Sequence, residues 1–160
     1  MSSGIAFCFP GQGSIESGMG RDVALASAAA REVFARGSEA SGLDLERLCF
    51  EAPQEELVDT AIQQPALVAT SLAFLAAVKD RFGIVPDFVV GHSVGEFAAL
   101  AAAGAMTVED SIALVRERGI AMAEAAAAKP GSMAAILGLD DEVVEQLCRR
   151  ILGVWPANYN

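Results

Sequence analysis

The sequence predicts an α/β fold, in which helices pack against a parallel sheet. Short apolar runs alternate with longer Ala-rich segments of helical periodicity along the 160 residues. Glycine and proline mark the ends of most of these segments. Hydrophobic residues make up 53% of the chain and charged residues 20%, which is typical of a chain that buries a core rather than of a disordered one.

Strands and helices are expected to alternate over the first hundred residues. Pro10-Gly11 ends an apolar run that we interpret as a buried strand, and Gly42 ends an Ala-rich helical pattern. Gln63-Gln64-Pro65 is expected to open a long helix, because proline fits the first helical turn. In chain order the predicted elements are a strand at 5–9, a helix at 22–40, a short helix after residue 53, a helix from 63 to about 82, a strand at 86–91 and a helix at 94–103.

The remainder of the chain is divided by a clear break at Lys129-Pro130-Gly131. Before the break, Thr107-Val-Glu-Asp110 resembles a capping box and marks the start of a helix. The predicted elements are a helix at 108–127, a strand at 132–137, a helix at 140–151 and the start of a strand at 154–159. So short a piece cannot form a stable sheet alone. We therefore interpret residues 1–128 as a core domain and residues 129–160 as the start of a small second domain.

Charge and cysteine content exclude several classes of protein. Lys and Arg number 11 against 21 Asp and Glu, so no basic surface is expected for nucleic acid or for an anionic membrane. The three cysteines lack C-x-x-C spacing, which argues against a disulfide framework or a metal site and favours a cytoplasmic location. No signal peptide is expected, and the longest apolar run, residues 97–106, is too short to cross a bilayer.

The strongest chemical signal is the G-x-S-x-G pattern Gly91-His-Ser-Val-Gly95. A strand is predicted before it and a helix after it, which is the setting of a nucleophile elbow with Ser93 at its tip. A structural Gly-Ser-Gly turn is the alternative. An oxyanion hole would take one N–H from Val94 and a second from Gln12, because the loop at 11–14 follows a strand at the same sheet edge. That loop is equally compatible with a glycine turn that binds nothing.

A general base for the serine is not evident in the sequence. His92 is the only histidine, and its side chain is expected to point to the face opposite Ser93. We therefore expect His92 to support the elbow rather than to take the proton. Three explanations remain open: the chain is part of a larger protein, another chain supplies the base, or the chain is inactive.

Several motifs in order resemble the N-terminal half of malonyl-CoA:acyl carrier protein transacylases. The matching segments are Phe9-Pro-Gly-Gln-Gly-Ser14, Gln64-Pro-Ala-Leu67, Gly91-His-Ser-Val-Gly-Glu96, Arg116-Glu-Arg-Gly119, Gly131-Ser-Met-Ala-Ala-Ile136 and Asn158-Tyr-Asn160. The resemblance implies a hydrolase-like parallel-sheet core with an inserted ferredoxin-like small domain, of which only the first part is present. It also implies that the catalytic histidine lies beyond Asn160.

The resemblance assigns roles residue by residue. Ser93 corresponds to the acylated nucleophile, Gln12 and Val94 to the oxyanion-hole donors, Arg118 to the arginine that binds the malonyl carboxylate, Gln64 to a glutamine of the acyl pocket, and His92 to the elbow histidine. Arginine suits this role because its planar fork binds a carboxylate at two points. Without the resemblance, Arg118 would be interpreted as a solvated helix arginine like Arg116. One departure is Ile15, where the family often has glutamine.

The activity implied is transfer of a malonyl group from malonyl-CoA to the phosphopantetheine thiol of acyl carrier protein, through an acyl-serine, in fatty-acid or polyketide synthesis. The expected partners are malonyl-CoA, acyl carrier protein and a missing C-terminal half, in cis or in trans. No metal, no other cofactor, no nucleic acid and no membrane is expected. The alternatives are a serine esterase or thioesterase with the same elbow, or an inactive fragment.

Overall fold

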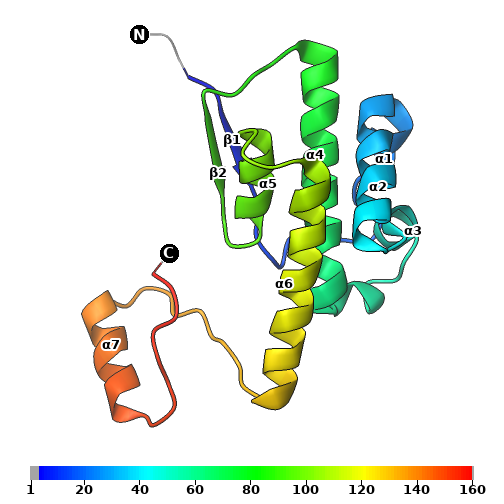
Figure 1. Ribbon diagram of the computed structural model, residues 1–160. Coiled ribbons are helices and arrows are strands. Elements are labelled where there is room, and N and C mark those ends of the chain that lie inside the picture. Colours follow the sequence, from blue (N-terminus) through cyan, green and yellow to red (C-terminus); the bar gives the residue numbers. More distant parts are fainter. Residues whose placement is uncertain (1–3, 160) are drawn as a thin grey trace. The chain divides into compact units, whose positions relative to one another are not determined.

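The computed structural model describes residues 4–159 as a helix-rich α/β fold with a small parallel sheet (Figure 1). The chain divides into two compact units, the first ending at Ala128 and the second beginning at Lys129. Each unit is described by itself below.

A two-stranded parallel sheet forms the edge at which the first unit carries its chemistry. β1 (Ala6–Phe9) pairs with β2 (Phe88–Gly91), and Phe9 lies opposite Gly91, so both strands end at the same edge. Helix α5 (Gly95–Ala102) follows β2 and packs against both strands. Phe7 and Val89 face the core, whereas Cys8 and Val90 are exposed. The expectation of a buried first strand therefore holds for one face only, because the described residues cover one face of the sheet.

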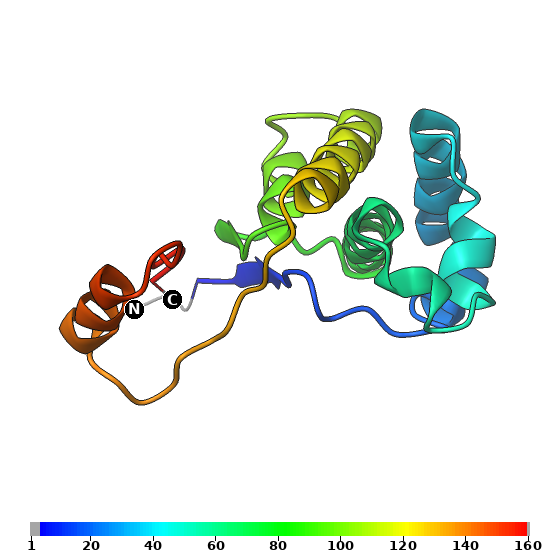
Figure 2. The same cartoon turned by 90° about the horizontal axis from the view of Figure 1, so that it is seen from below.

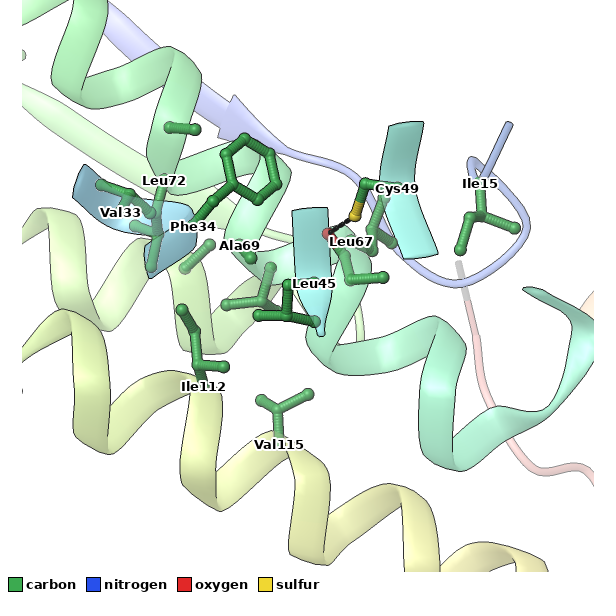
Figure 3. Packing of buried hydrophobic residues seen from close by; sticks show 14 of the residues in the cluster. Ile15, Val33, Phe34, Leu45, Cys49, Leu67, Ala69, Leu72, Ile112 and Val115 are labelled. Carbon is green, nitrogen blue, oxygen red and sulfur yellow. Dashed lines mark hydrogen bonds between the residues drawn. The ribbon is translucent and has the colours of Figure 1, made fainter. Parts of the chain in front are cut away.

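Three helices supply most of the core of the first unit. α4 (Thr60–Phe82) lies between α2 (Ala28–Ser41) and α6 (Val108–Ala128) in two perpendicular views (Figures 1 and 2). Phe34, Leu72 and Ile112, one from each helix, are almost fully buried (Figure 3). Because α4 contacts helices on two sides, its apolar residues continue around the helix instead of forming one stripe.

α4 also has the length and mean hydropathy of a membrane span. It is the one such helix in the described part of the chain, and 67% of its most apolar window is buried inside the protein. Burial of that extent is the behaviour of a core helix.

The predicted helix at 22–40 is in fact two helices, α1 (Arg21–Ala26) and α2. Ser27 interrupts them in an extended conformation (φ −136°), and its hydroxyl accepts a hydrogen bond from the Ala30 N–H. Serine competes with the helix in this way and then caps the next one, so the Ala-rich periodicity alone could not reveal the break.

The segment between α2 and α4 also differs from its prediction. α3 (Leu45–Phe50) lies before Pro53, capped by Asp44, and only a 3₁₀ turn, η1 (Glu56–Val58), follows that proline. α4 then begins at Thr60 rather than at Gln63, because the Asp59 carboxylate accepts a hydrogen bond from the Ala61 N–H (2.8 Å) and caps the helix.

The later helices of the first unit agree with the sequence. α5 and α6 lie within a residue of the predicted ranges. The Thr107 hydroxyl accepts a hydrogen bond from the Asp110 N–H (3.0 Å), which is the first half of the predicted capping box.

The second unit contains one helix, α7 (Asp141–Arg150), as the sequence predicts. The strands predicted at 132–137 and 154–159 are wrong among the described residues, which have no regular structure there. A strand exists only through hydrogen bonds to a partner, and these two segments do not pair with each other.

Candidate active site

Ser93 lies at the tip of a strained turn between β2 and α5. Its φ is 52°, and it is the only non-glycine residue with a positive φ in the described part of the chain. Such a conformation costs on the order of 1–3 kcal/mol and persists only where the surrounding contacts enforce it. The side chain is exposed, so its hydroxyl is accessible to a reactant. This geometry is that of a nucleophile elbow.

The two glycines of the motif are required by close contacts of the backbone. A Cβ at Gly91 would overlap the backbone of Gly95 and Glu96 across the turn. A Cβ at Gly95 would overlap the carbonyl of Phe9 and lie 2.5 Å from that of Pro10. The glycine spacing therefore lets the turn close and lets α5 approach the end of β1.

The loop after β1 meets the elbow at this sheet edge. The His92 N–H donates to the Phe9 carbonyl (3.0 Å), which extends the strand pairing by one residue. A Cβ at Gly11 would overlap the His92 ring nitrogen Nδ1 and lie 2.9 Å from the His92 carbonyl oxygen. Gln12, the next residue, is exposed and lies in the turn that follows. The loop predicted to face the serine thus lies against the residue that precedes it.

The side chains next to Ser93 differ in their surroundings. The Val94 side chain is fully buried, which anchors the start of α5. The His92 ring packs over Gly11, and no hydrogen bond joins it to Ser93 among the described residues. In this arrangement His92 supports the loop.

Arg118 and Gln64, predicted from distant parts of the sequence, are in direct contact. The Arg118 guanidinium donates a hydrogen bond to Gln64 Oε1, and the Gln64 Nε2 lies 3.2 Å from Met122 Sδ, to which it donates. Gln64 is fully buried, so both ends of its amide are fixed. The guanidinium carbon of Arg118 also lies 5.9 Å from the centre of the Phe97 ring on α5.

Within residues 4–159, the charge of Arg118 is not paired with an acidic side chain. Four ion pairs join the described residues, and none includes Arg118. Its observed partners are a neutral amide and an aromatic ring. Arginine is half-buried here, and a partly buried cation without a counter-ion attracts an anionic group strongly. The arrangement therefore has the chemistry to bind a carboxylate.

Arg116 is a residue that the sequence analysis misjudged as solvated. It is half-buried, and its guanidinium donates a hydrogen bond to the carbonyl of Ala61 in α4. In a helix that carbonyl would accept from residue 65, which is Pro65 and has no N–H. The sequence did hold a signal, since a proline inside a helix always leaves the carbonyl four residues earlier without its usual partner.

The described residues form an apolar groove but no cluster of metal-binding side chains. No group of three or more His, Cys, Asp or Glu side chains gathers within the part of the chain that the structure describes, so no metal centre is indicated there. An apolar groove of about 480 Å³ lies between β1 and α4, lined by residues such as Cys8, Leu67 and Phe74. Its lining includes Pro10 and Ser14 of the loop after β1, but not Ser93, Gln64 or Arg118.

A strained, exposed serine between a parallel strand and a helix, with a glycine loop beside it, defines an α/β protein of the nucleophile-elbow class. The family model of the acyl transferase domain matches residues 6–160, and the chain belongs to that family.

Among curated relatives, the malonyl CoA-acyl carrier protein transacylase of Bacillus subtilis is 46% identical over 149 residues, which cover 93% of this chain and 47% of the relative. Among solved structures, the malonyl-CoA:acyl carrier protein transacylase of Helicobacter pylori superposes with a TM-score of 0.89 at 37% identity, covering 99% of this chain and 51% of that one. A solved structure described as a type II polyketide synthase acyl-carrier protein in complex with its malonyl-transacylase contains a chain that superposes with a TM-score of 0.83 at 38% identity. The match covers 94% of this chain and 49% of that chain. The chain spans about half the length of the relatives it matches.

Proposed function

We propose that this chain supplies the nucleophile and the acyl-binding residues of a malonyl-CoA:acyl carrier protein transacylase. The observation that carries the proposal is Ser93, held exposed at a positive φ in a chain of the acyl transferase family. The closely similar relatives bear the name of this activity. Transfer to acyl carrier protein would supply malonyl groups for fatty-acid or polyketide synthesis.

In the first half-reaction, the Ser93 hydroxyl attacks the thioester carbonyl of malonyl-CoA. The new Oγ–C bond makes a tetrahedral oxyanion, to which the backbone N–H groups of Gln12 and Val94 donate hydrogen bonds. The C–S bond then breaks, and the CoA thiol leaves with the proton that the general base took from Ser93. In the second half-reaction, the phosphopantetheine thiol of acyl carrier protein loses its proton to the general base and attacks the carbonyl of the acyl-serine. A C–S bond forms, the C–Oγ bond breaks, and Ser93 regains a proton from the base as malonyl-acyl carrier protein leaves.

Arg118 is assigned the carboxylate of the malonyl group. A carboxylate placed against its guanidinium would gain a bidentate, charge-assisted pair in place of the neutral Gln64 oxygen. Gln64 remains beside the acyl group as a fixed amide, since Met122 holds its nitrogen end. This arrangement favours malonyl over acetyl, because acetyl has no charge to offer.

The general base is assigned to a second half of the protein, in cis or in trans. The chain spans about half of its relatives, and His92 lies against Gly11 rather than on Ser93. In the complete protein, residues 1–128 would form part of a hydrolase-like core, and residues 129–160 would begin an inserted ferredoxin-like domain. The exposed sheet face at Cys8 and Val90 supports this division, because a further layer would bury it.

The remaining parts of the proposal follow from the chemistry. Acyl transfer between a thioester, a serine and a thiol changes no oxidation state and requires neither a metal nor a redox cofactor. Malonyl-CoA and acyl carrier protein are the proposed partners, without nucleic acid or membrane, in the cytoplasm.

The test uses the complete domain, meaning this chain together with the second half. After a brief incubation with malonyl-CoA, mass spectrometry of the peptides is expected to find a malonyl adduct on Ser93 and no adduct in the Ser93→Ala variant. Ser14→Ala, which removes a hydroxyl from the neighbouring loop, is the matched control and is expected to retain the adduct. Labelling that survives Ser93→Ala would falsify the proposal.

The competing activity is hydrolysis by a serine esterase or thioesterase, which would use the same elbow. The acyl acceptor separates the two. With the acyl-enzyme formed, pantetheine thiol is expected to remove the malonyl group much faster than water does. Equal rates with thiol and water would support the hydrolase instead.

A further inference from the structure

The junction between the start of α4 and the middle of α6 is held by side chains that replace a missing backbone interaction. Pro65 cannot donate to the Ala61 carbonyl, which would otherwise be left to water or unpaired. The Arg116 guanidinium donates to that carbonyl from α6. The hydrogen bond thus joins two helices at a point where a helix normally bonds only to itself.

The backbones of the two helices also touch at this junction. A Cβ at Gly119 would lie 2.7 Å from the Thr60 carbonyl oxygen and 2.8 Å from the Ala61 Cα. The Arg116 contact and the Gly119 contact therefore meet at one residue of α4, Ala61. Two contacts at one point fix how far α6 slides along α4 and how closely it approaches.

The position of α6 along α4 also decides where Arg118 meets Gln64. Arg118 lies between Arg116 and Gly119 on α6, and Gln64 lies one helical turn after Ala61 on α4. The Arg118–Gln64 hydrogen bond consequently spans the junction that Arg116 and Gly119 fix.

We propose that Arg116 is a positioning residue for acyl selection: its hydrogen bond to the carbonyl that Pro65 leaves free sets α6 against α4, so that Arg118 presents its guanidinium to the malonyl carboxylate. The inference rests on the proposed function, since it assigns Arg118 to that carboxylate. Arg116 itself touches neither the acyl group nor Ser93 in this role.

Charge and burial favour positioning over simple stabilisation. The bond joins a cation to a neutral carbonyl, which is stronger than a bond between two neutral groups. The bond lies in a partly buried place, so the loss of Arg116 is expected to cost less stability than the loss of a partner at a fully buried carbonyl. Loss of Arg116 is therefore expected to shift α6 more than to unfold it.

The experiment compares Arg116→Met with Arg36→Met in the complete domain. Arg36 is the matched control, because it also holds α6, through Glu109, at a place remote from Gln64. The readout is the ratio of kcat/KM for malonyl-CoA to kcat/KM for acetyl-CoA. Arg116→Met is expected to lower this ratio about tenfold, mainly by raising KM for malonyl-CoA, while acetyl transfer changes by less than about twofold. Arg36→Met is expected to leave the ratio unchanged.

Two results would overturn the inference: an unchanged ratio in Arg116→Met, or equal losses with both acyl groups, which a purely structural role produces. Arg116→Gln, whose amide is too short to span the same gap, replaces the Met variant if that one does not fold, with the same two outcomes. Arg118→Met is measured in parallel. If Arg118→Met leaves the ratio unchanged, the proposed function loses its carboxylate site. If Arg118→Met lowers the ratio and the Arg116 variants do not, only the inference about Arg116 fails.

Discussion

Gly119→Ala tests the closeness of α4 and α6 directly. The added Cβ would lie 2.7 Å from the Thr60 carbonyl oxygen, whereas ordinary contact begins at 3.4 Å. The helices must therefore separate locally by about 0.7 Å, and the obstacle is backbone that cannot turn aside. A displacement of this size is comparable to the tolerance of a hydrogen bond, so the Arg118–Gln64 contact is expected to lengthen with it.

Two opposing effects set the magnitude for Gly119→Ala. Alanine in a helix interior gains about 1 kcal/mol over glycine. Overpacking of a closed interface costs about 1–3 kcal/mol, with the upper values where the neighbour is rigid. We expect a net loss of about 1–2 kcal/mol in the free energy of unfolding.

Gly37→Ala is the matched control for this substitution. Gly37 is also inside a helix and also at a contact with another helix, but its Cβ would meet the Cδ1 of Ile112 at 2.6 Å and that of Leu45 at 3.1 Å. These are ends of flexible side chains that can change rotamer, so the loss is expected to be within about 1 kcal/mol of zero. Urea denaturation of each variant measures the difference. A Gly119→Ala protein that is more stable than wild type, or equal to Gly37→Ala, refutes the close contact of the two helices.

Three further predictions follow from other parts of the chain. Burial raises the pKa of the Cys49 thiol to about 12, so iodoacetamide at pH 8 is expected to label Cys49 only after denaturation, as read by peptide mass spectrometry. A hydrogen bond from Arg36 lowers the pKa of Glu109 below its ordinary 4.5. The pair therefore stabilises the fold above pH 4.5, and this contribution is lost as the pH falls through the lowered pKa. Glu109→Gln is expected to flatten the acid side of a plot of Tm against pH, and an unchanged acid side would contradict this. Gly95→Ala, whose Cβ would overlap the end of β1, is expected to slow acylation of Ser93 at least tenfold, and wild-type acylation in a quench-flow assay would show that the elbow tolerates a side chain there.

The elbow could be predicted from the sequence because it is local. Five consecutive residues, Gly91 to Gly95, form the turn, and the apolar runs on either side predict the flanking strand and helix. Its position beside the loop at Gly11 followed from one topological rule, that parallel strands end at the same edge. No contact beyond the strand pairing was needed.

Two kinds of feature could not be predicted: a break where a side-chain hydrogen bond competes with the helix, and a strand whose pairing segment is not among the described residues. Ser27 breaks an Ala-rich helix because its side chain offers the backbone another hydrogen bond, and composition averages over that single residue. The strand at 132–137 has the right residues but no pairing partner among the described ones, and pairing is a property of two segments rather than of one.

The proposed acyl-binding residues are neither local like the elbow nor dependent on absent partners. The motifs that contain Gln64-Pro65 and Arg116 to Gly119 look like separate short patterns, and in isolation Arg116 suggests only a solvated helix. In the structure each motif holds what the other lacks: proline leaves a carbonyl free, an arginine donates to it, and glycine lets the backbones touch where that carbonyl lies. Gln64 and Arg118, the pair proposed to bind the acyl group, are hydrogen-bonded beside this crossing. A proline in one helix and a glycine in another, each costly where it stands, therefore point to a close crossing of the two helices, and the polar residues next to them are the ones to test first for a ligand.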